Sequence, residues 1–432
     1  MLQGKMKELT KKYGTTGFMY TEYPHKRFWT KEDVRHEIST NESMLYVHIP
    51  YCPKLCYFCT CHMSITNDYS KIEHYLEYLY REIELVQLLE PNIKEIHLGG
   101  GSPTMLNKGD FITLVEELST LVDIKTLDEF AIEIDPRKVD RDMANFYADM
   151  GINRISFGIQ DFNYDVQIAV NRMQPVECIE NLLVPEIRSR FKNGVNFDII
   201  CGLPKQTVNS IRDTCYEIVR LSPDRICLNY LHYSPEMAKH QKLMGDLPDF
   251  SERKDLFSEA LNVLTLGGYI RTGYDHFAKP TDANAQATIN NSVVWNSMGT
   301  TPGRVKDVIG VGVSSISSIN NHYFQNFYEL HEYEEALDNG KFPHYRGYKM
   351  TEDDILRRDI IQSLRNYASA DVKDKDYFKD EFETLKAFEA DGLVMVSGTS
   401  IAILEKEYSN LVCRVFDKFY DGEHFAPDLG ER

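Results

Sequence analysis

The sequence predicts an α/β fold: a partial barrel of about six strand–helix units, with an N-terminal arm and a small C-terminal helical, winged-helix-like domain. Three observations lead to this prediction. Short apolar runs alternate with amphipathic stretches between residues 44 and 275, which is typical of right-handed βαβ units in a parallel sheet. Glycines, cysteines and acidic residues directly follow several of these runs. Beyond about residue 345 the pattern changes to helices around one hairpin.

The first apolar run, 44–50, ends at a proline and leads into a cysteine-rich loop, which the amphipathic stretch 69–89 follows as a helix. The remaining barrel strands are expected at 94–98, 129–134, 154–158, 195–200, 225–230 and 269–272, and the helices at 140–150, 176–189, 210–221 and 251–266. Ligands bind at the carboxyl ends of the strands in parallel α/β folds. The cysteine loop, the glycine run 99–101, the strand end with Glu133 and Asp135, Gln160 and Asp198 are therefore expected to meet at one mouth of the barrel.

We divide the chain into an arm (1–43), the barrel with an extension (44–320) and the C-terminal domain (345–432). In the last of these, helices are expected at 351–367, 377–391 and 408–420, with two short strands in 393–404. DNA binding is a familiar use of a winged helix. The charge balance favours a lid or packing role here.

Charge and hydropathy exclude several classes of protein. Asp and Glu outnumber Lys and Arg by 66 to 48, for a net charge of −18 over 432 residues. A dominant nucleic-acid or anionic-membrane surface would need a basic excess. No apolar run approaches the roughly 18 residues of a membrane span, and the first residues lack the apolar core of a secretion signal. We expect a cytoplasmic monomer.

Four of the nine cysteines lie within ten positions: Cys52, Cys56, Cys59 and Cys61. In a reducing compartment such a cluster indicates metal binding or catalysis. The C-x3-C-x2-C spacing lets three thiols bind three corners of a 4Fe–4S cluster and leaves one iron open for a small molecule. Cysteine spacing alone favours this interpretation over zinc, for which Cys61 or His62 would complete the ligands. The other cysteines (Cys178, Cys201, Cys215, Cys227 and Cys413) are expected to be buried hydrophobic residues.

Residues 46–61 (YVHIPYCPKLCYFCTC) resemble the cluster loop of radical S-adenosylmethionine (SAM) enzymes. Within that superfamily the chain resembles the oxygen-independent coproporphyrinogen III oxidases over nearly its whole length. Further matching segments are 99–104 (GGGSPT), 132–137 (IEIDPR), 158–162 (GIQDF), 170–172 (VNR), 198–207 (DIICGLPKQT), 274–280 (YDHFAKP) and 310–317 (GVGVSSIS). The resemblance implies a partial (β/α)6 radical SAM barrel.

The resemblance also implies cofactors and their ligands. Cys52, Cys56 and Cys59 would bind the 4Fe–4S cluster. Two SAM molecules are expected. The first would contact Tyr46, Gly100, Glu133, Leu231 and Ile316, the second Gly101, Ser102, Gln160, Arg172 and Asp198, and Phe58 is also expected at the cofactors. No catalytic residue is assigned beyond the cluster and SAM.

Five residues near these motifs have competing interpretations. Of Glu133 and Asp135, we expect Glu133 to face the ligand and Asp135 to point to the opposite face and cap a helix. His48 is expected to be buried and hydrogen-bonded within the sheet, and Cys61 to lie beside the cluster without binding it. His276, next to Asp275, is open between shaping the substrate pocket and a structural hydrogen bond.

Residues 20–29 of the arm mix aromatic side chains with Lys26 and Arg27. An arm is more often a docking element. We nevertheless hypothesise that it lies over the barrel mouth and supplies cations to tetrapyrrole propionates. Replacing both residues with Ala would then weaken substrate binding and leave SAM cleavage intact.

The resemblance implies an oxidoreductase of haem biosynthesis that converts coproporphyrinogen III propionates to vinyl groups, with a reductant such as flavodoxin or ferredoxin as partner. The segment 296–302 (NSMGTTP) departs from the family's NFQGYTTQ pattern, and the arm lacks the family's Arg before its YTSYP-like string. Substrate identity is therefore open. The alternatives are a related radical SAM methyltransferase, including the type that opens haem anaerobically, and a non-catalytic haem chaperone.

Overall fold

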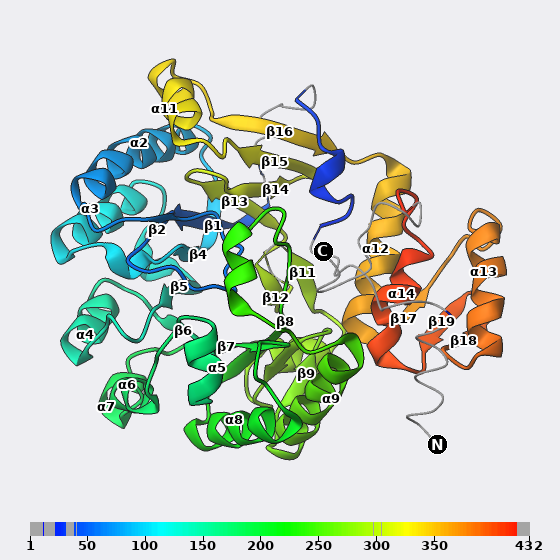
Figure 1. Cartoon of the computed structure of the whole chain (residues 1–432). Coiled ribbons are helices and arrows are strands. Elements are labelled where there is room, and N and C mark those ends of the chain that lie inside the picture. The colour runs from blue at the N-terminus through cyan, green and yellow to red at the C-terminus, as the bar shows by residue number, and fades with distance from the viewer. Residues whose placement is uncertain are drawn as a thin grey trace.

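A curved sheet of twelve strands forms the body of the computed structural model, which describes residues 12, 22–31, 39, 41–296, 298–303 and 305–420. Its strand order is β16-β15-β14-β13-β1-β4-β5-β6-β7-β8-β10-β9. Figure 1 shows helices along the outer side of this sheet, while α12 and its neighbours lie to one side. The prediction of an α/β fold with a partial barrel is confirmed.

The parallel part of the sheet contains six consecutive strand–helix units. Its strands are β1 (Glu42–Ile49), β4 (Asn92–Gly100), β5 (Glu129–Ile134), β6 (Arg154–Gln160), β7 (Val195–Cys201) and β8 (Arg225–Tyr230). The helices between and after them are α2 (Ser70–Gln87), α3 (Lys108–Ser119), α4 (Arg141–Asp149), α5 (Tyr164–Ala169), α6 (Val176–Leu182), α7 (Pro185–Arg188), α8 (Val208–Leu221) and α9 (Phe250–Leu266). The sequence patterns did not predict α3 or α5.

Side-chain alternation along the strands separates two environments. Leu45, Val47 and Ile49 of β1 are fully buried in the main hydrophobic core together with apolar residues of α2. Tyr46 and His48 lie outside this core and form a hydrogen bond with each other. Successive residues of a strand point to opposite faces. The outer face is therefore apolar, and the inner face of the barrel carries polar groups.

Two expected elements differ in the structure. The helix predicted at 176–189 is split into α6 and α7, and Pro185 is the first residue of α7. Proline fits the first turn of a helix but cannot donate the hydrogen bond that a helix interior needs. The strand predicted at 269–272 is β9 (Ile270–Thr272), which pairs with β10 (His276–Ala278), and β10 runs antiparallel to β8. The antiparallel hairpin of β9 and β10 therefore forms the edge of the sheet next to β8.

The other edge is extended by four strands that the patterns did not predict individually. β13 (Asp307–Val311) runs parallel to β1, and β14 (Ile316–Ile319), β15 (His322–Asn326) and β16 (His344–Lys349) continue antiparallel. Helix α11 (Leu330–Asp338) lies between β15 and β16 in the chain. Helix α10 (Ala283–Ile289) and the hairpin of β11 (Val294–Asn296) and β12 (Gly299–Thr301) precede β13.

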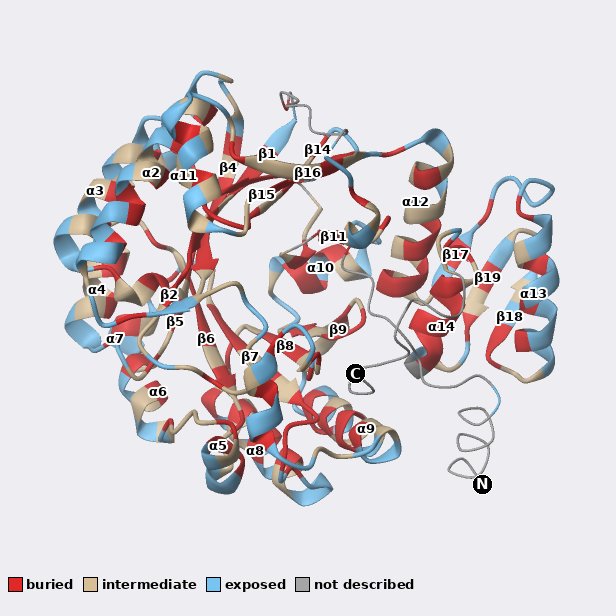
Figure 2. Ribbon diagram, turned by 45° about the horizontal axis from the view of Figure 1, so that its top comes forward, coloured by how far each residue is buried: buried red, intermediate tan, exposed pale blue. Residues whose placement is uncertain are grey.

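The C-terminal region has a hydrophobic core of its own, in which Phe378, Leu385 and Phe416 are buried. It contains α12 (Glu352–Tyr367), α13 (Lys379–Ala390), α14 (Ser409–Arg414) and an antiparallel sheet of β17 (Ser369–Asp371), β19 (Ser400–Ile403) and β18 (Val394–Ser397). Figure 2 shows buried residues on the sides of α12 and α14 that face each other. The helix predicted at 408–420 ends earlier, at Arg414.

Among the described residues, every helix is too short or too polar to cross a membrane.

Candidate active site

The cysteine loop is fixed at both of its ends. Residues Tyr51–Cys52 (β2) pair in parallel with Ser64–Ile65 (β3) directly after β1. The amide N of Ser64 donates to Pro50 O at 2.6 Å, and the amide N of Thr66 donates to Cys52 O at 3.1 Å. The loop therefore leaves the end of β1 and returns to the same place, so that its cysteines are held at the mouth of the barrel.

Neighbouring segments hold the middle of the loop through its backbone. Asn171 Nδ2 donates to Leu55 O at 2.7 Å, and the amide N of Tyr57 donates to Val170 O at 3.0 Å. On the other side, Gln241 Nε2 donates to Phe58 O at 3.0 Å, and His240 Nε2 lies 2.7 Å from Cys59 O. These contacts fix the loop backbone without using the thiols. Sequence reasoning missed His240 and Gln241 because no motif marks them.

The loop covers a cavity of about 420 Å³ at the carboxyl ends of the parallel strands. Twelve of the predicted site residues line it: Cys52, Cys56, Phe58, Cys59, Gly100, Gly101, Ser102, Glu133, Gln160, Arg172, Asp198 and Leu231. Tyr46 and Ile316 do not line it. Tyr46 lies just below, against Gly99 and Glu133, and Ile316 packs near Trp29 and Tyr323. The predicted convergence of strand ends at one mouth is confirmed.

The glycines of the cavity wall are required by close approach. A Cβ atom on Gly101 would lie 2.8–3.0 Å from the backbone of Tyr51, and one on Gly99 would lie 2.8 Å from Glu133 Oε1. Gly100 has a φ of +110°, a conformation that L side chains rarely adopt. The run thus lets β4 pass directly beneath the cysteine loop, where the amide N of Gly101 donates to Ile49 O at 2.8 Å.

Two carboxylates face the cavity with different surroundings. The Glu133 side chain is 39% exposed, and its Oε1 lies 3.2 Å from His97 Nε2. Asp198 accepts hydrogen bonds from Ser156 Oγ at 3.0 Å and Asn196 Nδ2 at 2.8 Å. Burial raises the pKa of Asp198, and the nearby charge of Glu133 raises it further. Both groups are placed to accept from hydroxyl or ammonium donors of a ligand.

Asp135 was predicted to point away from the site, and this is wrong. Residues two apart on a strand share a face, so Asp135 lines the same cavity as Glu133. Its carboxylate accepts from Arg137 Nε at 2.9 Å and Nη2 at 2.7 Å. Arg172 Nη2 lies 3.9 Å from Asp135 Oδ1 and donates to Gly158 O at 2.7 Å. Arg137, which no pattern singled out, therefore belongs to the cavity wall.

The thiols experience opposing influences. The pKa of Cys59 is lowered to about 7, chiefly by a hydrogen bond from Cys61 and further by Arg172. Burial, followed by repulsion from Cys59 and Cys56, raises the pKa of Cys52 to about 12. Arg172 Nη1 lies 3.5 Å from Cys56 Sγ. Cationic neighbours favour thiolates, the form that binds metals.

The residues present fit a 4Fe–4S cluster with SAM. Cys52, Cys56 and Cys59 line one cavity together with Cys61, two arginines lie beside Cys56, and Gly100 and Gly101 form part of the same cavity wall. Within the described part of the chain, no three His, Cys, Asp or Glu side chains converge closely enough to hold a single metal ion.

His48 and His276 have structural partners. His48 is buried, with Nδ1 3.0 Å from Tyr46 OH and Nε2 2.9 Å from His62 O, as predicted. His276 Nδ1 lies 2.7 Å from Asp275 Oδ1, and its ring meets Trp295 edge-on at 5.3 Å. Neither histidine lines the cavity.

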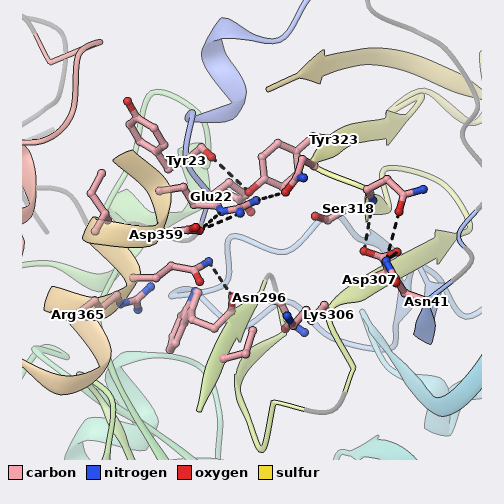
Figure 3. Close-up of a pocket in the computed structure, with 17 residues that line it drawn as sticks. Glu22, Tyr23, Asn41, Asn296, Lys306, Asp307, Ser318, Tyr323, Asp359 and Arg365 are labelled. Carbon is pink, nitrogen blue, oxygen red and sulfur yellow. Dashed lines mark hydrogen bonds and ion pairs between the residues drawn. The ribbon is translucent and has the colours of Figure 1, made fainter. Parts of the chain in front are cut away.

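A second cavity, of about 500 Å³, lies between the start of β13, the end of β14, the β11 hairpin and α12. Figure 3 shows Asn41 and Asp307 joined on one side of it and Arg365 on the other. Arg365 lies 3.3 Å above the Trp295 ring and 3.9 Å from Asp275. This cavity contains no cysteine and none of the predicted cofactor residues.

Comparisons with known proteins agree with this geometry. The family model of the radical SAM superfamily matches residues 46–218. The oxygen-independent coproporphyrinogen III oxidase of Pseudomonas aeruginosa is 33% identical, over 95% of each chain. The Escherichia coli K12 protein of the same name is 35% identical, over 95% of this chain and 94% of that one. The solved structure of coproporphyrinogen III oxidase (HemN) from Escherichia coli, described as a radical SAM enzyme, superimposes with a TM-score of 0.86 at 33% identity, covering 93% of this chain and 97% of that one.

Proposed function

Because this chain belongs to the oxygen-independent coproporphyrinogen III oxidase family and is a radical SAM enzyme, we propose that it converts propionate side chains of coproporphyrinogen III to vinyl groups. The supporting observation is the combination of about one-third identity over 95% of the chain with Cys52, Cys56 and Cys59 all lining one barrel-mouth cavity. In this reaction a propionate loses one hydrogen atom from its β-carbon, its carboxylate leaves as CO2, and one electron passes to an acceptor.

We propose that Cys52, Cys56 and Cys59 hold the 4Fe–4S cluster. When bound and reduced, the cluster and SAM supply an organic radical that abstracts the hydrogen atom. The chain's own residues prepare the place. Arg172 and Arg137 offset the negative charge of the thiolates, because both cations lie beside Cys56.

The cavity wall would orient SAM. Glu133 and Asp198 present carboxylate oxygens that accept from amino or ribose groups, and the glycine run keeps side chains out of the wall beneath the cysteine loop. Gln160 sits in the cavity with a φ of +66°, just after a register shift between β6 and β7. Such irregularities re-aim side chains at functional sites. Two SAM molecules, in the sets of contacts that the resemblance implies, remain part of this proposal.

We also propose that the enzyme works in the cytoplasm as a monomer and receives electrons from a small carrier such as flavodoxin or ferredoxin. One electron must reach the cluster before the reaction starts, and one electron must leave the substrate as the vinyl group forms, so the reaction needs both a donor and an acceptor.

Anaerobic reconstitution with iron and sulfide, followed by incubation with reductant, SAM and coproporphyrinogen III, tests the proposal. We expect products with vinyl groups, a mass loss of one CO2 and two hydrogens per converted propionate, and 5′-deoxyadenosine in proportion. The same mixture without SAM is the control. S-adenosylhomocysteine with a methylated product would indicate the methyltransferase alternative, and stoichiometric haem binding without turnover would indicate the chaperone.

A further inference from the structure

The described part of the arm is fixed against the last strand of the sheet. Thr30 and Gly347 of β16 exchange backbone hydrogen bonds at 2.9 and 2.8 Å, and the Trp29 ring stacks on Tyr323 at 4.8 Å. The short helix η1 (Lys26–Phe28) directly precedes these contacts. Figure 1 shows it as the blue coil beside β14, β15 and β16. The basic residues of the arm therefore occupy a defined place.

Arg346 of β16 is a half-buried cation that has no acidic partner in the part of the chain that the structure describes. Its Nε donates to Gln325 Oε1 at 2.8 Å and its Nη2 donates to Tyr328 OH at 3.1 Å. The rings of Trp29, Tyr328 and Tyr345 surround its guanidinium at 5.7–5.9 Å. Among the described residues no carboxylate lies within ion-pair distance of it. Charged side chains that are partly removed from water are normally paired with an opposite charge. The Arg346 guanidinium therefore has N–H groups that can donate to an anion of a bound ligand.

Further basic groups surround the same place. The pKa of His25 is lowered to about 3, first by burial and then by Lys26, Arg27, Arg346 and His232. His232 has its pKa lowered by burial and by Lys26, whereas Glu236 acts in the opposite direction. Groups from the arm, β16 and the segment after β8 thus lie within electrostatic reach of one another. In a chain with a net charge of −18, this is a local positive spot.

The basic residues around Arg346 adjoin the cysteine-lined cavity. His232 lines that cavity together with the cysteines. On the other side, the Tyr328 ring meets the His62 ring edge-on at 5.7 Å, and His62 directly follows Cys61. An anionic group held at Arg346 would belong to a molecule whose other parts reach the cavity.

We propose that Lys26 and Arg346 form a carboxylate-binding subsite, which holds a propionate other than the one that reacts. This inference rests on the proposed function and narrows the hypothesis for the arm. Lys26 is half-buried and has no ion pair among the described residues, whereas Arg27 is exposed and lies over the Phe28 ring at 5.1 Å. Arg27 is therefore left out of the subsite. A polycarboxylated tetrapyrrole is the ligand class that presents several propionates around one flat ring.

Equilibrium titration of the reconstituted holoenzyme with coproporphyrin III, a stable oxidised probe, tests the subsite. We expect Arg346→Gln and Lys26→Gln each to weaken binding about tenfold or more, because a hydrogen bond to a charged group contributes roughly 1.5–3 kcal/mol. Arg27→Gln, which removes the same charge one residue away, is the matched control and should change Kd less than about twofold. The tetramethyl ester of the probe should bind all four proteins alike, and Arg346→Lys should recover part of the loss.

Unchanged binding in both subsite variants, or no binding of the probe to the unmodified holoenzyme, would overturn the subsite. Reductant-driven SAM cleavage without tetrapyrrole checks that the variants fold and hold their cofactors. The two proposals fail separately. Charge-dependent binding without vinyl products leaves the subsite and removes the proposed function, whereas vinyl formation with an unchanged KM in the variants removes the subsite alone.

Discussion

Charged residues lie at both ends of the parallel barrel strands, but their surroundings differ. We call the carboxyl ends of the strands the mouth of the barrel, and the amino ends, where β5, β6 and β8 begin with Glu129, Arg154 and Arg225, the floor. At the floor, Glu129 accepts from Arg154 Nε at 2.7 Å and lies 3.2 Å from Arg225, which also contacts Asp282 at 2.9 Å. At the mouth, Glu133 faces the cavity with His97 as its neighbour. The floor charges pair with one another, whereas Glu133 at the mouth has a histidine as its neighbour and a side chain that is 39% exposed.

This difference separates structural from functional charge. A buried ion pair is costly to break because removing one partner strands the other. Carboxylates with incomplete partners in a cleft are typical of binding sites. If the distinction holds, changes at the floor will affect stability and changes at the mouth will affect chemistry, and each variant below tests that separation.

The largest effect is expected for Cys59→Ser at the mouth. Loss of a cluster ligand should reduce 5′-deoxyadenosine formation by more than about a hundredfold, beyond the 10–100-fold typical of outer-shell partners of a metal site. The unfolding free energy of the metal-free protein should not change. Iron content and deoxyadenosine yield are the measurements. Cys61→Ser is the control, and an equal loss of iron in that variant would contradict the assignment of the ligands.

Next in size is Arg225→Met at the floor. It leaves Asp282 without the cation and Glu129 with only one, and we expect a loss of about 3–5 kcal/mol in unfolding free energy. Denaturant unfolding measures this. Arg220→Met is the control, because Arg220 pairs with Glu217 and Glu180 at the surface and should cost about 0–1 kcal/mol. Equal effects of the two changes would show that the floor network does not stabilise the barrel.

Gly101→Ala tests the close packing of the cavity wall at the mouth, where β4 passes beneath the cysteine loop. Its Cβ would overlap the Tyr51 backbone, which cannot move without displacing the cysteine loop. We expect a loss of about 1–3 kcal/mol in stability, typical of overpacking, together with weaker SAM binding. In the control, Gly109→Ala on α3, the nearest atom is a side-chain oxygen of Asn107 at 3.2 Å, and stability should change by less than about 1 kcal/mol. SAM binding that survives in Gly101→Ala would contradict the role of close packing.

The last prediction concerns two buried glutamates and is a pH dependence, whose effect is at most about 1.4 kcal/mol for each pH unit. Burial alone raises the pKa of Glu129, but Arg154 and Arg225 outweigh it and lower the value to about 2. Glu82 is also buried but has only neutral donors, Tyr333 OH, the Gly312 amide and Asn326 Nδ2, so burial raises its pKa to about 7.

The sign for Glu82 follows from proton binding. Between the ordinary pKa of a glutamate, roughly 4.5, and about 7, the folded protein keeps a proton that the unfolded chain has lost, so stability falls as pH rises through this range. The slope approaches about 1.4 kcal/mol per pH unit. Glu82→Gln should remove this component, as denaturant unfolding from pH 4 to 8 would show. An unchanged slope would mean that Glu82 is ionised in the folded state.

Much of the fold was predictable from local patterns. The strands at 129–134 and 225–230 match the structure at both ends; Asp128, Asp135 and Pro136 bound the first strand, and Pro223 and Asp224 precede the second. The extension β13–β16 was not predicted as strands. β13 and β15 are buried along their whole length, and short runs without alternation do not distinguish a strand from other buried chain.

The site shows the same division. Cysteine spacing and glycine runs were visible because metal ligation and close backbone approach demand particular residue types at fixed intervals. The partners Arg137, His97 and His240 were not, because an arginine or histidine in a sequence carries no sign of what it faces. Asp135 was misplaced by a wrong reading of strand alternation.

The sequence alone determined the cysteine triad, the order of strand and helix, and the family, since these depend on residues close together in the chain. Only the tertiary structure decided which charges lack partners. Arg346 and Lys26 are more than three hundred positions apart, yet both lie within electrostatic reach of His25. Pairing across that separation is set by how the sheet curves and where the arm crosses it, and Coulomb energy depends on distance in space.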